Sequence, residues 1–131
     1  MSPTPPPEEL LHRQVHPNFV LAGRVSSQAF IPTPKDEGKL SVDLGSLTTP
    51  QAALARYRGE GRASAGVWSI TVGECSSLGL PTVPDPITGE HPNPAHAYVD
   101  FQGLSKADTR AKGQLLARAA HARGMQHTTS E

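Results

Sequence analysis

Prolines and glycines divide this chain into short elements and so limit the folds open to it. The 131 residues include 13 prolines and 12 glycines, and a proline has no backbone N–H to donate inside a strand ladder or a helix. Between these breaks, apolar patterns predict strands at 10–16, 25–31, 39–43, 67–71 and 95–101. Because strands come first and helices later, we expect an α+β fold. It would be a small mixed or antiparallel sheet of about five short strands, packed by two main helices and joined by proline-rich loops.

Helices are predicted where capping residues precede a periodic pattern. Thr49-Pro50 supplies the preferred N-cap and first helical residue for a helix at 50–59. Ser105 and Asp108 form a variant of the capping box, with Asp in place of Glu or Gln, at the start of the longest helix, 105–123. The three- and four-residue spacing on this helix predicts a buried stripe of mostly small residues, namely Ala107, Ala111, Leu115, Ala119 and Ala122.

The length of the chain fits one domain, which we expect at 10–124. A disordered proline-rich tail is expected at 1–9 and a fraying tail at 125–131. The formal net charge is zero at pH 7, which argues against general nucleic-acid binding, because that depends on a basic surface. One cysteine, no signal-peptide pattern and no apolar run long enough to cross a bilayer together predict a cytoplasmic protein without membrane contact.

The first candidate catalytic group is Cys75 with His96 and Asp100. Cys75 lies near the start of a predicted short helix, 74–78, where the helix dipole lowers the pKa of a thiol. His96 and Asp100 share one face of their strand, about 13 Å apart, which is too far for direct contact. The order Cys-then-His resembles the papain-like peptidases of bacterial cell walls, although Glu-Cys-Ser-Ser stands where that family has Asp-Cys-Ser-Gly. The resemblance implies a cysteine hydrolase, and the alternative is a small buried cysteine.

The second candidate group combines Arg13, Ser41 and a polar residue of the last strand. The order of elements over 10–101 resembles the ADP-ribosyltransferase fold, in which a first-strand Arg or His grips NAD, a Ser starts a middle strand and a later strand presents a catalytic Glu. The resemblance implies that Arg13 and Ser41 hold a dinucleotide. His96 begins the last strand here, so His96 or Asp100 would stand in place of the usual acid.

The segment 32–38, Pro-Thr-Pro-Lys-Asp-Glu-Gly, connects two predicted strands. Its prolines fix φ and Gly38 permits positive φ, so the loop is stiff on one side and sharply turned on the other. Lys35 and Asp36 are then held at a defined place. They serve either as a recognition element at the rim of a site or as solubilising charges on a hairpin connection.

The chain is also similar to small bacterial proteins of unknown function. They share a His-Pro, a Pro-Thr-Pro-Lys-Asp and a Leu-Ser-Val pattern, found here at 16–17, 32–36 and 40–42. This resemblance implies no activity. With the small size, it suggests an accessory protein of the kind found beside a larger enzyme or toxin, in a toxin or defence-type operon.

We therefore expect a binding protein without a cofactor, which contacts a protein partner or ligand through the 32–38 loop and through His12 and Arg13. The alternative is an ADP-ribosyltransferase-like enzyme that handles NAD, and the third hypothesis is a hydrolase built on Cys75 and His96. The histidine spacings fit no zinc site, so no metal is predicted. The sequence leaves open whether the protein is an enzyme.

Overall fold

The computed structural model of the chain describes residues 5–21, 24–32, 37–124 and 127–128. Lys35 and Asp36 lie outside the described residues. The strands are β1 (Leu10–Val15), β2 (Val20–Leu21), β3 (Arg24–Val25), β4 (Lys39–Leu44), β5 (Gly66–Thr71), β6 (Thr82–Pro84), β7 (His96–Asp100) and β8 (His127–Thr128). The helices are α1 (Pro50–Gly59), α2 (Val72–Ser76) and α3 (Lys106–Arg123), with two 3₁₀ helices, η1 (Pro17–Phe19) and η2 (Ser27–Phe30).

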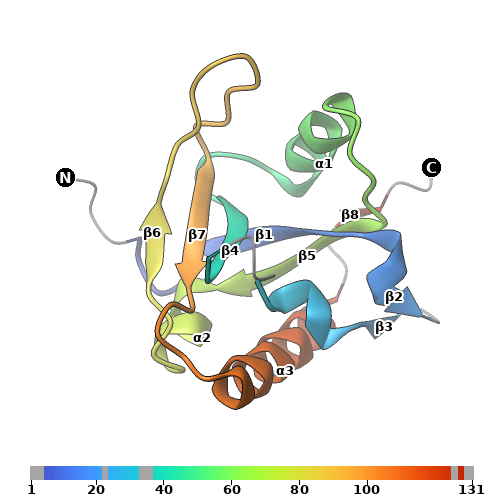
Figure 1. Cartoon of the computed structure of the whole chain (residues 1–131). Helices are drawn as coiled ribbons and strands as arrows, with labels where there is room; N and C mark the ends of the chain where they lie inside the picture. Colours follow the sequence, from blue (N-terminus) through green and yellow to red (C-terminus); the bar gives the residue numbers. More distant parts are fainter. Residues whose placement is uncertain (1–4, 22–23, 33–36, 125–126, 129–131) are drawn as a thin grey trace.

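Six strands form one sheet in the order β6-β7-β4-β1-β5-β8, and every pairing in it is antiparallel. β2 and β3 form a separate two-stranded ribbon. Figure 1 shows α1 on one face of the sheet and α3, with α2, on the opposite face. The α+β class and the antiparallel sheet packed by two main helices are thus confirmed. Edge strand β6 falls within 81–94, which the sequence predicted as a proline-rich loop.

The predicted capping residues begin both main helices. The side chain of Thr49 accepts a hydrogen bond from the backbone N–H of Ala52 at 3.1 Å, and α1 starts at Pro50, directly after Thr49. The side chain of Ser105 does the same for the N–H of Asp108 at 3.1 Å, and α3 follows. Each cap satisfies a backbone donor that has no partner within its own helix.

The apolar core lies between the sheet and α3. In β7, Ala97 and Val99 are buried in it, while His96 and Tyr98 alternate with them and are partly exposed. This alternation gives the sheet one apolar face and one polar face. The core also contains Leu11, Leu40, Val42, Leu44, Trp68, Ile70, Leu80 and Phe101.

The predicted buried stripe of α3 is wrong. Ala107, Ala111 and Ala122 are exposed, and Leu115 is 44% exposed. The helix instead buries Gly113, Leu116, Ala117 and Ala120, which also recur at three- and four-residue spacing. Alanines stand on both sides of this helix, so the periodicity of small residues did not identify the buried side.

The predicted strand at 25–31 is also wrong. Strand pairing ends with β3 at Val25, and after Ser26 the chain turns into η2. The hydroxyl oxygen of Ser26 accepts a hydrogen bond from the N–H of Gln28 at 3.2 Å, and such a local bond competes with strand pairing. The turn places Ala29 and Phe30 in the core.

Both ends of the described chain are bonded to other elements of the fold, the N-terminal end to α2 and the C-terminal end to the sheet. The segment 1–9 was expected in a disordered tail, but the carbonyl oxygen of Glu9 accepts a hydrogen bond from the N–H of Val72 at 3.0 Å. At the other end, within the segment expected to fray, 127–128 form β8 and pair with β5. The described ends therefore belong to the folded domain.

Close packing between α3 and η2 depends on Gly113. A Cβ atom at this position would overlap Cγ1 of Ile31 and lie 3.3 Å from the carbonyl oxygen of Phe30. Because glycine has no side chain, the backbone of the helix lies directly against the side chain of Ile31 and the carbonyl oxygen of Phe30 here. This contact fixes the position of the middle of α3 over the sheet.

We expect Gly113→Ala to lower the free energy of unfolding by about 1–3 kcal/mol, the usual cost of adding a methyl group to a filled core. In an open helix position the same exchange stabilises a protein by up to about 1 kcal/mol. Gly59→Ala on α1 is the matched control, because nothing lies within 4 Å of the added Cβ. Urea denaturation measures both changes, and a Gly113→Ala protein as stable as the wild type would contradict this packing argument.

Candidate functional site

Two clefts contain the groups that could bind or transform a ligand. The polar cleft, a cavity of about 520 Å³, lies on the α1 side of the sheet and is lined by β1, β4, α1 and the 87–96 segment. The apolar cleft, a cavity of about 650 Å³, lies on the α3 side. It is lined by Phe19, Gln28, Ile31, Pro32, Glu37, Gly38, Phe101, Gln102, Gly103, Leu104, Lys106, Thr109 and Arg110.

A row of polar residues crosses the sheet beneath the polar cleft. The strand register places Ser69 opposite His12, His12 opposite Asp43, and Asp43 opposite His96. Directly opposed residues of antiparallel strands point to the same face. Three of the four, His12, Asp43 and His96, line the cleft, while Ser69 is fully buried.

Asp43 is a buried carboxylate with two partners. Its Oδ2 atom lies 3.0 Å from Nη2 of Arg56 on α1, and its Oδ1 atom accepts a hydrogen bond from Nδ2 of Asn93 at 2.7 Å. Arg56 also pairs with Glu60 at 2.9 Å. A buried charge is tolerated only when it is paired and hydrogen-bonded. Asp43 therefore attaches both α1 and the segment around Asn93 to the sheet.

His12 is enclosed beneath the cleft. Only 2% of the residue is exposed, and its Nδ1 atom lies 2.7 Å from the hydroxyl oxygen of Ser69. Burial lowers the pKa of His12, although the charges of Asp43 and Glu9 act in the opposite direction. His12 was predicted as a ligand contact, but its ring is directed to Ser69 and is almost inaccessible to solvent.

Arg13 was predicted to hold a ligand, but its guanidinium group binds backbone carbonyls. Nε donates to the carbonyl oxygen of Ala29 at 2.8 Å, and Nη1 donates to that of Ser41 at 2.9 Å. These bonds connect β1 to η2 and to β4. Arg13, Ser41 and His96 nevertheless line one cleft, the polar cleft.

His96 has a defined orientation at the edge of the polar cleft. Its Nδ1 atom lies 2.8 Å from the carbonyl oxygen of Asp85. A carbonyl only accepts hydrogen bonds, so Nδ1 is the donor in this contact. Asp100 lies four residues further along β7 and accepts a hydrogen bond from the N–H of Gln102 at 2.8 Å. The structure does not bring Asp100 and His96 together.

Cys75 lies in the apolar core and is fully buried. Burial, with a further contribution from the charge of Glu74, raises the pKa of this thiol to about 12, opposite to the lowering expected from the helix dipole. Cys75 shares the core with Ala97 and Val99 of β7, whereas His96 is on the other face of that strand. The structure does not bring Cys75 and His96 together, and the thiol is protonated at neutral pH.

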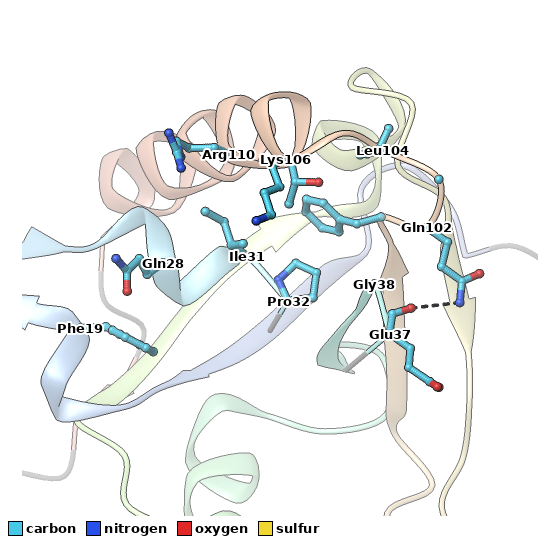
Figure 2. A pocket seen from close by; sticks show the side chains of 13 residues that line it. Phe19, Gln28, Ile31, Pro32, Glu37, Gly38, Gln102, Leu104, Lys106 and Arg110 are labelled. Atoms are coloured by element: carbon cyan, nitrogen blue, oxygen red, sulfur yellow. Dashed lines mark hydrogen bonds between the residues drawn. The ribbon is translucent and has the colours of Figure 1, made fainter. Parts of the chain in front are cut away.

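The apolar cleft was missed by the sequence analysis. Figure 2 shows Lys106 extending from α3 toward Ile31 and Pro32, with Glu37 on the other side of the cleft. The Nε2 atom of Gln102 donates a hydrogen bond to the carbonyl oxygen of Glu37 at 3.1 Å and so joins two of the cleft walls.

One sequence signal did point to this region. The 32–38 loop was expected at the rim of a site, and its described ends, Pro32 and Glu37–Gly38, line the apolar cleft. The predicted positive φ of Gly38 is confirmed at 80°. The apolar residues opposite the loop could not be assigned to a cleft, because 25–31 was interpreted as a strand.

Comparison with known protein families, with curated proteins and with solved structures finds no match to this chain. Within the described residues, no cluster of three His, Cys, Asp or Glu side chains is arranged to hold a metal ion. In the same part of the chain, none of the helices has the length and apolar character needed to cross a membrane.

The low pKa of His12 predicts how stability changes with pH. Its ordinary pKa is 6.5 and the folded value is lower, so the unfolded chain takes up the proton first as the pH falls. We expect the free energy of unfolding to decrease from about pH 8 to about pH 5.5, and to decrease less in His12→Gln. Urea denaturation at several pH values measures the two slopes. His121→Gln, at an exposed site, controls for the exchange itself, and equal slopes in wild type and His12→Gln would refute the prediction.

Proposed function

We propose that this protein acts by binding, and that the apolar cleft is its contact surface. The observation that supports this most directly is the set of apolar side chains that line the cavity without being fully covered. Phe19, Ile31, Pro32 and Leu104 are each partly exposed there. Cavities of roughly 300–1,000 Å³ with mainly apolar walls and few polar groups are typical ligand sites, and this cleft, at about 650 Å³, is of that size.

The contrast between the two clefts favours the apolar one. In the polar cleft, the side chains of Asp43, Arg56, Glu60 and Asn93 bind one another. A ligand there would have to compete with existing hydrogen bonds. In the apolar cleft, a ligand displaces water mainly from apolar surface, which is favourable by about 25 cal/mol per Å².

This proposal keeps the expectation of a binding protein. It places the contact surface at the apolar cleft and not at His12 and Arg13. Of the predicted contacts, His12 and Arg13 are engaged inside the protein, whereas the described ends of the 32–38 loop line the cleft. A protein partner would use the same cleft by inserting an apolar side chain. The bacterial origin, the accessory role and the cytoplasmic location stay predictions from the sequence.

A neutral apolar fluorophore, N-phenyl-1-naphthylamine, tests the proposal. We expect saturable binding to the wild type and an affinity at least about tenfold lower, or about 1.4 kcal/mol, in Thr109→Trp, because the indole ring would occupy the cleft. Gln114→Trp is the matched control, since Gln114 is exposed on the same helix and does not line the cleft. Absence of saturable binding, or equal loss in both variants, would reject the apolar cleft as the site.

A second candidate function is supported by a different observation. Arg13, Ser41 and His96 line the polar cleft together, as an ADP-ribosyltransferase-like enzyme would need. In this hypothesis NAD lies against Ser41 and Tyr57, and Nε2 of His96 acts as the base in place of the usual glutamate. The weakness of the hypothesis is Arg13, whose guanidinium group is already bonded to two carbonyls.

Thermal denaturation with increasing NAD tests the second candidate. At a hundredfold excess over Kd, a ligand that binds only the folded state adds about 2.7 kcal/mol to the free energy of unfolding. If the polar cleft holds NAD, the melting temperature rises with NAD, and Ser41→Tyr abolishes the rise by filling the cleft. Thr109→Trp, which fills the apolar cleft, should leave the rise intact. No shift at millimolar NAD would eliminate this candidate.

A further inference from the structure

The walls of the apolar cleft carry an uneven set of charges. Lys106 and Arg110 line it from the first two turns of α3, and Glu37 lines it from the opposite wall. Among the described residues, neither Lys106 nor Arg110 makes a hydrogen bond or an ion pair through its side chain. Among the described lining residues, the cleft therefore combines an apolar interior with two cations on the α3 side and one acid on the opposite wall.

Other basic residues of α3 that reach back to the protein do have partners. Nζ of Lys112 donates a hydrogen bond to the carbonyl oxygen of Leu78 at 2.5 Å. Arg123 pairs with Glu74 at 3.0 Å and also donates to the carbonyl oxygen of Ser69 at 2.8 Å. Structural roles thus account for Lys112 and Arg123, whereas the two cations at the cleft have none in the described fold.

The position of Lys106 suits the head group of a ligand. In Figure 2 its side chain points from α3 toward Ile31 and Pro32, which line the same cavity. Lys106 is also the first residue of α3, where the positive end of the helix dipole favours an anion. A carboxylate beside this ammonium group would have its attached apolar body directed against Ile31 and Phe101.

We propose that the ligand of the apolar cleft is a small amphipathic carboxylate, with an alkyl or aryl body and a single acidic head. The head pairs with Lys106 and the body fills the cavity. Glu37, on the far wall, repels a second carboxylate and thereby favours ligands with one acidic end. This inference rests on the proposed function and adds the chemical class of the ligand.

Three eight-carbon ligands separate the charge preference from simple apolar binding: octanoate, octan-1-ol and octylammonium. Each is titrated, below its micelle concentration, against the wild-type protein carrying N-phenyl-1-naphthylamine. We expect octanoate to bind up to about fivefold more tightly than octan-1-ol, the upper range for a partly exposed ion pair. Added salt should reduce that preference. Lys106→Gln should abolish the preference for octanoate, and Lys106→Glu should reverse it in favour of octylammonium. Arg118→Gln is the control, because Arg118 is exposed on α3 away from the cleft, and this variant should keep the preference for octanoate.

The outcomes distinguish this inference from the proposed function. If octanoate and octan-1-ol bind equally well, or octylammonium binds best, the carboxylate assignment is overturned while the cleft stands as a ligand site. If the octanoate preference persists in Lys106→Gln, the assignment is overturned as well. If neither the fluorophore nor any of the three ligands binds, both the proposed function and the inference fail. A preference for octanoate that depends on Lys106 alone supports both.

Discussion

The carboxylate of Asp43 is the interaction on which one whole side of this protein depends. Asp43 lies on β4, inside the sheet, and is 4% exposed. A carboxylate buried there without partners would cost several kcal/mol, so the pairs to Arg56 and Asn93 are required by its position. Both partners come from segments that cover the polar face. The polar cleft lies between these two segments, which share Asp43 as a point of attachment.

On the opposite face the decisive constraint is steric. Gly113 lets α3 touch the segment that follows η2, where a larger residue would overlap Ile31. Toward its N-terminus, the same helix presents Thr109 and Arg110, whose side chains cannot close onto Ile31 in this way. The helix and η2 are therefore in tight contact at one point and separated beside it, and the separation forms the apolar cleft. Gly113 thus permits the close packing beside which the cavity lies.

Sequence patterns were reliable where a local cause determined the structure. The strand His96–Asp100 follows from strict alternation, and the caps Thr49 and Ser105 each satisfy a nearby backbone donor. Predictions that depended on contacts between distant parts of the chain were wrong or incomplete. Alanines on several sides of α3 concealed the buried side, and Ser26 initiated a turn inside an apparent strand. The polar cleft was anticipated only through the group Arg13, Ser41 and His96, and the apolar cleft only through the 32–38 loop. The other walls could not be predicted, because each cleft is formed by segments far apart in the chain that meet only after folding.

Residue types with chemical potential do not make a site when the fold already uses them. A cysteine, a histidine beside a serine and a strand arginine can each take part in catalysis. Here, however, Cys75 packs in the core, His12 contacts Ser69, and Arg13 joins backbone segments. The ammonium group of Lys106, in contrast, has no structural role among the described residues. It is not needed by any described contact, and it stands next to apolar surface that folding leaves uncovered. Contiguous apolar patches on a protein surface often mark interaction sites, and the ligand class proposed above would match both the apolar wall and the charge of Lys106.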